Sequence, residues 1–197
     1  EVIVALNEVP LPGAFNLANV VPAVAVGKLL GVPTEKIADA VRNFKPLEHR
    51  LEFVGRFDGI EFYNDSIATV PEAAIAALAA LTGQVETVLL GGYDRGLDFS
   101  GLAKALLKSG VKALILFPAT GARIWKAVCD ADPTAPTRLK HFFVDSMEEA
   151  VRLAKQHTSQ GMACLLSPAS PSFGLFRDYR ERGERFKQLA KESEPRA

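Results

Sequence analysis

Tyr63-Asn64-Asp65-Ser66-Ile67-Ala68-Thr69-Val70-Pro71-Glu72 is the stretch that decides the fold, because an apolar run ends in it and a polar turn opens an Ala-rich segment. Before it, the apolar positions of 60–62 predict a strand, and Asp58-Gly59 has the form of a two-residue hairpin turn that joins this strand to another over 51–54. The stretch therefore predicts a strand end, a loop and a helix start in immediate succession.

The polar residues of this loop suit an anionic ligand. Thr69 and Glu72 have the spacing of a capping box, which predicts a helix over 71–81 whose first turn presents free N–H groups and the positive end of its dipole. Asp65, Ser66 and Thr69 add side chains that can hold a hydroxyl, a cation or a carboxylate. A plain strand-to-helix connection with a good cap explains the same residues, so the rest of the chain must decide.

Composition bounds the class of protein. The chain has 197 residues, 48% of them hydrophobic, so it can bury the core of one domain and more. Its 23 basic residues balance 23 acidic ones, which argues against nucleic-acid and anionic-membrane partners, and no apolar run is long enough to span a membrane. Cys129 and Cys164 have apolar neighbours, so we expect reduced core residues of a cytosolic protein. The chain begins at Glu1 directly on an apolar run, and we expect it to be a piece of a longer protein.

The first part of the chain differs from the remainder. The elements that it predicts are a strand over 2–6, a buried helix over 16–30 that ends with Gly31 at C′, and a second helix capped by Thr34. Pro46 then prevents helix continuation in a polar linker, which predicts a domain boundary between 1–45 and 46–197.

Strands and helices alternate after this boundary. The further strands predicted are 87–90, 111–117, 141–144 and 162–166, and the further helices are 100–108, 122–129, one capped by Ser146 and Glu149, and a long charged helix at the end. Short apolar strands between such helices predict a doubly wound α/β domain with a mostly parallel sheet covered on both faces. The polar loops 64–69, 91–98 and 167–172 all follow strands, so they should share one sheet edge, the usual ligand side.

These loops match no common catalytic or cofactor motif. The glycines of 91–98 do not form G-x-G-x-x-G, so a dinucleotide cradle is not expected; Arg95 suits a carboxylate, although a solvated loop charge is an equal alternative. The loop 167–172 lacks a G-x-S-x-G elbow, which favours a hydroxyl-lined anion site over a nucleophilic serine. The histidines have no spacing typical of a base or a metal ligand, so we predict no catalytic residue and no metal site in this chain.

Asn16 and Asn19 lie three residues apart on the predicted helix over 16–30, hence on one face. An unsatisfied buried amide costs about 1–3 kcal/mol, so each needs a partner. Capping or core hydrogen bonding explains Asn16, whereas Asn19, one turn into the helix, is harder to explain without a ligand.

Taken together, the motifs resemble the carboxy-terminal part of the Mur ligases, the ATP-dependent amide-forming enzymes of peptidoglycan synthesis. They occur in order along nearly the whole chain. The matching segments are Gly13-x-x-Asn16-x-x-Asn19, Leu47-Glu48-His49-Arg50-Leu51-Glu52, Asn64-Asp65-Ser66-x-Ala68-Thr69, Leu89-Leu90-Gly91-Gly92-x-x-Arg95-Gly96-x-Asp98-Phe99, and Leu165 to Phe173 with Phe176, Tyr179, Arg182-Gly183 and Phe186.

The resemblance implies a division of the chain and a set of site residues. Residues 1–45 would be the helical end of a truncated central ATPase domain, and 46–197 a Rossmann-like, glutamate-binding carboxy-terminal domain. The implied ATP-binding residues are Asn16, Asn19, Arg50 and Asp65. The implied glutamate-binding residues are Ser66, Thr69, Arg95, Ser172, Phe173 and Tyr179.

The resemblance also implies a reaction. ATP with Mg²⁺ phosphorylates the carboxylate of UDP-N-acetylmuramoyl-L-alanine, and the amino group of glutamate attacks the acyl phosphate. Central and amino-terminal domains of a parent chain would be partners, in the cytoplasm, in a ligase serving cell wall biogenesis, cell shape and cell division. No nucleic acid or membrane insertion is implied.

Three departures from the family pattern matter. The phosphate-binding G-x-x-G-K-[ST] loop and the metal-binding region are absent, so we expect no catalysis by this chain alone. Ile67 stands where the D-glutamate enzymes of the family have a lysine, and Arg95 stands where the family has another lysine later in the chain. A subgroup of the family that resembles this Asn-Asp-Ser-Ile-Ala-Thr form adds L-glutamate. Phe15 replaces a histidine before Asn16. A non-catalytic nucleotide-binding α/β module and an interaction domain without a small ligand stay as alternatives.

Overall fold

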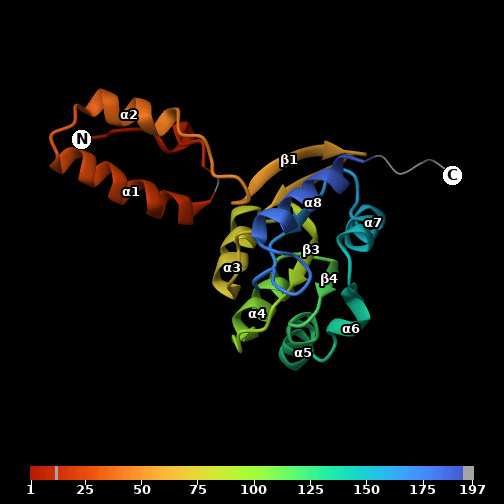
Figure 1. Cartoon of the computed structure of the whole chain (residues 1–197). Coiled ribbons are helices and arrows are strands. Elements are labelled where there is room, and N and C mark those ends of the chain that lie inside the picture. Colours follow the sequence, from red (N-terminus) through yellow and green to blue (C-terminus); the bar gives the residue numbers. More distant parts are fainter. Residues whose placement is uncertain (12, 193–197) are drawn as a thin grey trace. The chain divides into compact units, whose positions relative to one another are not determined.

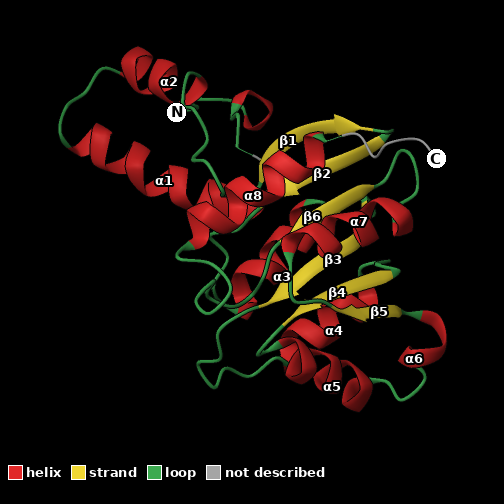
Figure 2. Ribbon diagram, turned by 45° about the vertical axis from the view of Figure 1, so that its right-hand side comes forward, coloured by secondary structure: helices red, strands yellow, loops and turns green. Residues whose placement is uncertain are grey.

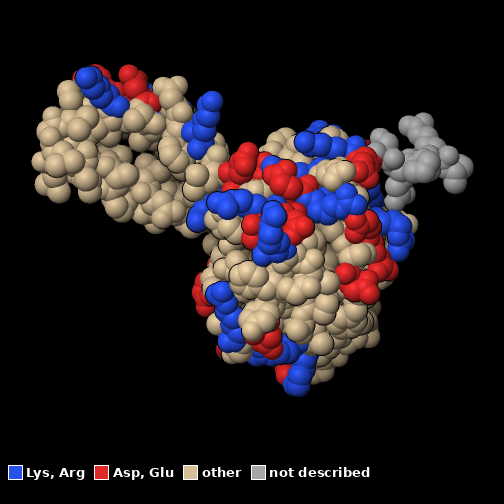
Figure 3. Space-filling model, in the orientation of Figure 1, with Lys and Arg blue, Asp and Glu red and all other residues tan. Residues whose placement is uncertain are grey.

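The computed structural model describes residues 1–11 and 13–192, which form two compact units, Glu1–Glu48 and His49–Ala197. Figure 1 shows the elements of both units, coloured along the sequence. On the face shown in Figure 3, basic and acidic side chains are interspersed over the larger unit and form no continuous patch of one sign. No helix among the described residues has both the length and the apolar character needed to cross a bilayer.

Unit 1, residues 1–48, is a pair of packed helices. Its elements are the 3-10 helix η1 (Leu6–Glu8), α1 (Ala14–Leu29) and α2 (Thr34–Arg42). Ile37 and Ala38 of α2 are buried against α1, and a Cβ on Gly27 would lie 3.1 Å from Ile37, so this glycine permits the close approach of the two helices. Helix α1 ends as expected, because Gly31 at C′ has a φ of 73°.

Three predictions for unit 1 are wrong. Residues 2–6 form no strand, since none of the described residues of this unit supplies a strand with which they could pair. Helix α1 is apolar all round, but it is largely exposed; Val21 is 65% and Leu29 85% accessible. Thr34 is not a cap, because α2 begins at Thr34 itself with Pro33 at the N-cap position.

Unit 2, from His49 on, contains one six-stranded sheet in the order β1-β2-β6-β3-β4-β5 (Figure 2). The strands are β1 (Glu52–Phe57), β2 (Ile60–Asn64), β3 (Val85–Gly91), β4 (Ala113–Phe117), β5 (Lys140–Phe143) and β6 (Ala163–Leu166). β1 and β2 pair antiparallel, and the other neighbours pair parallel. Asp58 and Gly59 make the predicted hairpin turn with φ values of 52° and 81°.

Helices cover both faces of this sheet. They are α3 (Pro71–Ala80), α4 (Ser100–Lys108), α5 (Gly121–Ala131), α6 (Ala135–Arg138), α7 (Met147–His157) and α8 (Tyr179–Lys191). α7 and α8 pack together on one face, and α3, α4 and α5 pack in a row on the other (Figure 2). The core under α7 and α8 includes Phe62 and Phe186, whose ring centroids lie 6.0 Å apart. The predicted doubly wound α/β fold is therefore confirmed.

Three details of unit 2 differ from expectation. Thr69 and Glu72 form no capping box, because α3 begins at Pro71, whose fixed φ suits the first helical position, and Val70 becomes the N-cap without a side-chain bond. The short helix α6 has no counterpart among the predicted elements. Cys164 is a buried free thiol as predicted, whereas Cys129, also free, is only partly buried.

The strand order brings three loops to one place. The chain passes from β3 outward to β4 and β5 and then returns to insert β6 between β2 and β3. Because β2, β6 and β3 are parallel neighbours, their carboxyl ends lie side by side. The loops 65–70, 167–178 and 92–99 therefore share one edge of the sheet, as the sequence predicts; we call them the three-loop edge.

Candidate functional site

Main-chain hydrogen bonds join the three loops to one another. The N–H of Asp65 donates to the carbonyl of Leu166 (2.7 Å), and the N–H of Tyr93 donates to the carbonyl of Pro171 (2.8 Å). Gly92 lies so close to the loop after β6 that an added Cβ would come within 2.2 Å of the Pro171 carbonyl oxygen. The edge is therefore a fixed surface built from all three loops.

Asp65 is buried directly beneath this surface. It is 5% exposed, and its carboxylate accepts hydrogen bonds from the N–H of Leu51 (3.0 Å) and the hydroxyl of Ser167 (2.8 Å). Burial raises the pKa of Asp65 to about 6, although these two bonds and the charge of Arg50 act in the opposite direction. The carboxylate is thus held in place, and its raised pKa lets it gain or lose a proton close to neutral pH.

Arg50 lies in the turn that precedes β1. Its Nε is buried and has no hydrogen-bond partner among the described residues, while the guanidinium acts electrostatically on Asp65. A buried donor without an acceptor costs stability unless a ligand satisfies it. Arg50 therefore suits an anionic group such as a phosphate.

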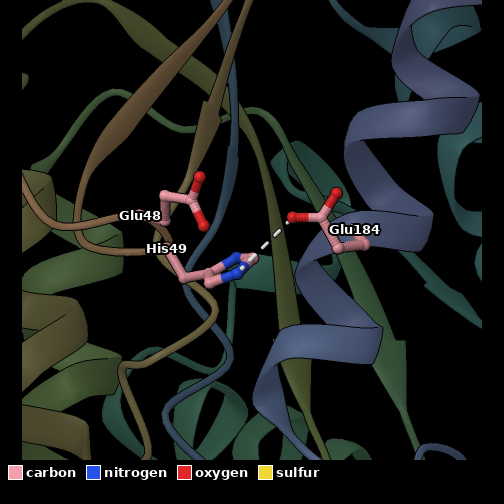
Figure 4. Close-up of side chains that lie close together, drawn as sticks. All are labelled: Glu48, His49 and Glu184. Carbon is pink, nitrogen blue, oxygen red and sulfur yellow. Dashed lines mark ion pairs between the residues drawn. The ribbon is translucent and has the colours of Figure 1, made fainter.

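His49 connects this turn to β2 and α8. Its Nδ1 lies 2.9 Å from Asn64 Nδ2, so Nδ1 accepts, and its Nε2 faces Glu184 of α8 at 3.6 Å (Figure 4). The other end of the Asn64 amide accepts the N–H of Ser66 (3.1 Å). A Cβ on Gly183 would lie 2.2 Å from His49 Nδ1, which explains the glycine inside α8. The position of Ser66 thus depends on the turn before β1.

Ser66 and Arg182 form a fully buried pair under the loops. The Ser66 hydroxyl donates to the carbonyl of Tyr179 (2.7 Å) and accepts from Arg182 Nε (3.0 Å). Arg182 also donates from Nη2 to the Ser66 carbonyl (2.7 Å) and from Nη1 to the Ser170 carbonyl (3.0 Å). The hydroxyl of Ser66 is therefore already used within the fold. The sequence marks Arg182 only as part of a matching segment and does not signal this role.

The remaining residues predicted to bind glutamate lie at or near the surface of the edge. Arg95 is exposed, Thr69 and Tyr179 are half-buried, and Ser172 is buried. Arg95 forms no ion pair with any described residue, whereas its neighbour Asp94 pairs with Arg123. Arg95 is thus available for a ligand carboxylate.

An aromatic pair lines the same edge. Phe173 is 51% exposed, and its ring meets that of Tyr93 edge to face at 6.1 Å. Tyr93 comes from the loop after β3 and Phe173 from the loop after β6, so the pair spans two loops. Tyr93 is not among the residues predicted from the sequence; the signal that could have found it is its place in the Gly91–Asp98 loop.

Asn16 and Asn19 belong to unit 1, while Arg50 and Asp65 belong to unit 2. Asn16 is buried in the first turn of α1. Asn19 is exposed and lines an apolar cavity of about 360 Å³ within unit 1, together with Val20, Val24 and Ile37. Asn16 is thus buried and Asn19 exposed, and the assignment of both amides to a ligand stays a prediction.

The described groups favour recognition of small anions. Arg95 is exposed on the edge, and Arg50 before β1 has an unpartnered Nε, whereas Arg182 lies buried beneath the loops with its donors bonded to Ser66 and Ser170. Carboxylates and phosphates are the ligands that such guanidinium groups bind best.

Comparison with known proteins gives a family. Residues 49–170 match the family model described as Mur ligase, glutamate ligase domain. The whole chain is 38% identical over 196 residues to a UDP-N-acetylmuramoylalanine–D-glutamate ligase of Solibacter usitatus, of which it covers 42%. It is also 38% identical over 185 residues, 93% of its length, to a UDP-N-acetylmuramoyl-L-alanine–L-glutamate ligase of Xanthomonas oryzae, of which it covers 39%. The chain therefore spans about two fifths of the length of these relatives.

Solved structures show the same fold. MurF from Acinetobacter baumannii superposes with a TM-score of 0.69 at 19% identity, over 92% of this chain and 38% of that one. At this identity the likeness concerns the fold alone.

Proposed function

Because the chain belongs to the Mur ligase family, we propose that it is the carboxy-terminal part of an ATP-dependent UDP-N-acetylmuramoyl-L-alanine:D-glutamate ligase, a MurD-type enzyme of peptidoglycan biosynthesis. The observation that carries the proposal is the three-loop edge: three loops from adjacent parallel strands, joined by hydrogen bonds, present the exposed Arg95 and the half-buried Thr69 where a dicarboxylic amino acid would bind. Such an enzyme would act in the cytoplasm in cell wall biogenesis.

The proposed reaction has two steps. ATP transfers its γ-phosphoryl group to the carboxylate of UDP-N-acetylmuramoyl-L-alanine, which leaves ADP. The amino group of glutamate then attacks this acyl phosphate, and the amide forms as phosphate departs. Mg²⁺ would neutralise charge on the phosphates.

The residues of this chain would bind and orient the reactants. In unit 2, Arg95 would pair with a glutamate carboxylate, and the groups around it would be Thr69, Ser172, Phe173 and Tyr179. Ser66 would act by keeping the loop after β2 in position, since its hydroxyl, its N–H and its carbonyl are all bonded within the protein. Holding the amino group in a fixed position makes its attack effectively intramolecular.

For ATP we propose the residues that the resemblance implies. Asn16 and Asn19 are assigned to the adenine side and Arg50 to the phosphates, while the buried Asp65 would act on the nucleotide through its charge interaction with Arg50. The unpartnered Nε of Arg50 supports its assignment. Residues 1–45 would then be the end of a central ATPase domain and 46–197 the glutamate-binding domain. Since the sequence has no G-x-x-G-K-[ST] loop, we expect no catalysis by this chain alone.

L-Glutamate is the second candidate substrate, and Ile67 favours it. Position 67 lies in the loop after β2, with its N–H bonded to the His49 carbonyl (3.1 Å), and an apolar side chain there removes one cation from the edge. Relatives named for D-glutamate and for L-glutamate are equally identical to this chain, at 38%. The overall match therefore does not distinguish the enantiomers.

Ligation by the full-length protein tests the proposal. The protein is incubated with UDP-N-acetylmuramoyl-L-alanine, ATP and Mg²⁺, separately with D- and L-glutamate, while phosphate release is followed. We expect release with one enantiomer only; release with L-glutamate alone would replace the D-glutamate assignment. No release with either would contradict the ligase assignment for this substrate, and tight ATP binding by the isolated chain would favour a nucleotide-binding module.

A further inference from the structure

Arg182 is a buried cation whose contacts are all with neutral groups. It is 1% exposed, and its three hydrogen bonds go to the hydroxyl and carbonyl of Ser66 and to the carbonyl of Ser170. Within residues 1–11 and 13–192 no carboxylate forms an ion pair with it. Buried charges in proteins are normally paired, so this arrangement is costly in the free protein.

The acidic groups on the surrounding elements are bonded elsewhere. Asp65, after β2, accepts from Leu51 and Ser167. After β3, Asp94 accepts from Arg123 and from the N–H of Gly96. On α8 and at its N-cap, Glu181 accepts the N–H of Arg177, and Asp178 accepts the N–H of Glu181. None of these described carboxylates is directed to Arg182.

The position of Arg182 in its helix adds to this cost. It lies in the first turn of α8, where the helix dipole presents its positive end and where a cation is unfavourable. Burial lowers the pKa of Arg182 to about 9, which leaves it charged at neutral pH. A residue that breaks local rules in this way is most often retained for a site.

Arg182 bonds two of the three loops and lies close to the third. It bonds Ser66 after β2 and Ser170 after β6, and its Nη1 lies 3.3 Å from the place that a Cβ on Gly92 would occupy after β3.

We propose that Arg182 is the positioning residue for the glutamate substrate. It holds Ser66 and Ser170 in place, and it supplies a positive charge that no described carboxylate neutralises until the carboxylate of the ligand binds nearby. This inference rests on the proposed function. The carboxylate need not touch Arg182, because the guanidinium polarises the Ser66 and Ser170 backbone and acts through the low-dielectric interior.

Two substitutions in the full-length protein test it by steady-state kinetics. In Arg182→Met the charge is lost, and we expect the KM for glutamate to rise by about tenfold or more while the KM for ATP stays within about twofold. In Arg182→Lys the charge is kept on a group whose pKa falls on burial. At pH 6 the KM of this variant for glutamate should be near the wild-type value. As pH increases and the lysine loses its proton, the KM of the variant should rise, whereas the KM of the wild type should not show this rise.

Arg185→Met is the matched control, because Arg185 lies one turn further along α8 and pairs at the surface with Glu148. Its KM for glutamate should not change. Circular dichroism and thermal melting of each variant report the fold. An unchanged KM for glutamate in folded Arg182→Met, an equal rise in the KM for ATP, or unfolding of Arg182→Lys would overturn the proposal. If the wild-type protein turns over neither D-glutamate nor L-glutamate, the proposed function is overturned, and this inference is overturned with it.

Discussion

Asp65 illustrates what burial does to a single residue of the site. Its carboxylate is fixed by Leu51 and Ser167 and has a pKa raised to about 6 from 3.8, mainly because burial disfavours the charged form. A raised folded-state pKa contributes stability that is complete below the unfolded value and is lost as pH rises through the folded value. Ionisation of Asp65 therefore weakens the fold between pH 3.8 and about 6.

Asp65→Asn should remove this pH dependence. Asparagine can still accept from Leu51 and can donate to Ser167, so the packing is preserved. The unfolding free energy of the variant minus that of the wild type should grow by about 3 kcal/mol between pH 3.5 and pH 7.5 in urea titrations. Asp58→Asn, which removes an exposed turn carboxylate, is the control for loss of one negative charge. Equal differences at the two pH values would show that Asp65 is not the group that titrates.

At the scale of elements, the two predicted capping boxes have opposite outcomes. Ser146 caps α7, and its hydroxyl accepts the N–H of Glu149 at 3.3 Å. At α3, Pro71 shifts the start of the helix so that Thr69 lies outside it. The same four-residue spacing therefore caps the helix at α7 but not at α3, because Pro71 moves the start of α3.

Substitution of the two residues by alanine should show this difference. Ser146→Ala should lower the unfolding free energy by about 1 kcal/mol, because an orphan N–H of α7 loses its acceptor. Thr69→Ala should change it by less than about 0.5 kcal/mol. Chemical denaturation of both variants gives the comparison. An equal loss in the two would mean that Thr69 does cap α3.

The accuracy of the sequence predictions also varies by element. The helix over 100–108 is predicted to the residue, since Ser100 opens a clear apolar period and no proline interrupts it. Residues 2–6 have the composition of a strand, but composition cannot supply a partner strand. Likewise, the apolar surface of α1 predicts burial, yet burial depends on what lies beside the helix, as Leu29 shows.

The shared edge of the three loops was predictable from the sequence, and the hydrogen bonds beneath it were not. Strand ends followed by polar loops place Asn64, Gly91 and Ser167 on one edge, because parallel strands end on the same side. Ser66 and Arg182 are 116 positions apart, and only the packing of α8 brings them together. The sequence pattern therefore predicts polar loops on one edge, whereas the position of Arg182 beneath them is seen only in the structure.

At the scale of the whole molecule, the two units differ in how they are stabilised. Unit 2 has a continuous core of buried residues from its sheet and from α7 and α8. Unit 1 leaves much of α1 exposed. The last segment of unit 1, 45–48, lies outside helices and strands and is exposed, including Leu47 at 57%.

Limited proteolysis with subtilisin should therefore cut first between Asn43 and Glu48. An exposed segment with few contacts opens locally at little cost, while unit 2 must unfold to be cut. Mass spectrometry should find a resistant product that begins near His49, and the same digestion in urea should abolish it. A first cut inside the sheet of unit 2 would contradict this order of stability.

The parallel pairing of β2, β6 and β3 also sets how far apart the three loops begin. Neighbouring strands in a sheet lie about 4.8 Å apart, so the outer two of the three loops start about 10 Å apart. Only four carbon–carbon bonds separate the two carboxyl carbons of glutamate, which is less than this span, so side chains of the outer loops would have to reach inward toward the loop after β6 to hold such a ligand. The strand order sets where these side chains begin, and the side chains themselves would decide both the length and the handedness of the ligand.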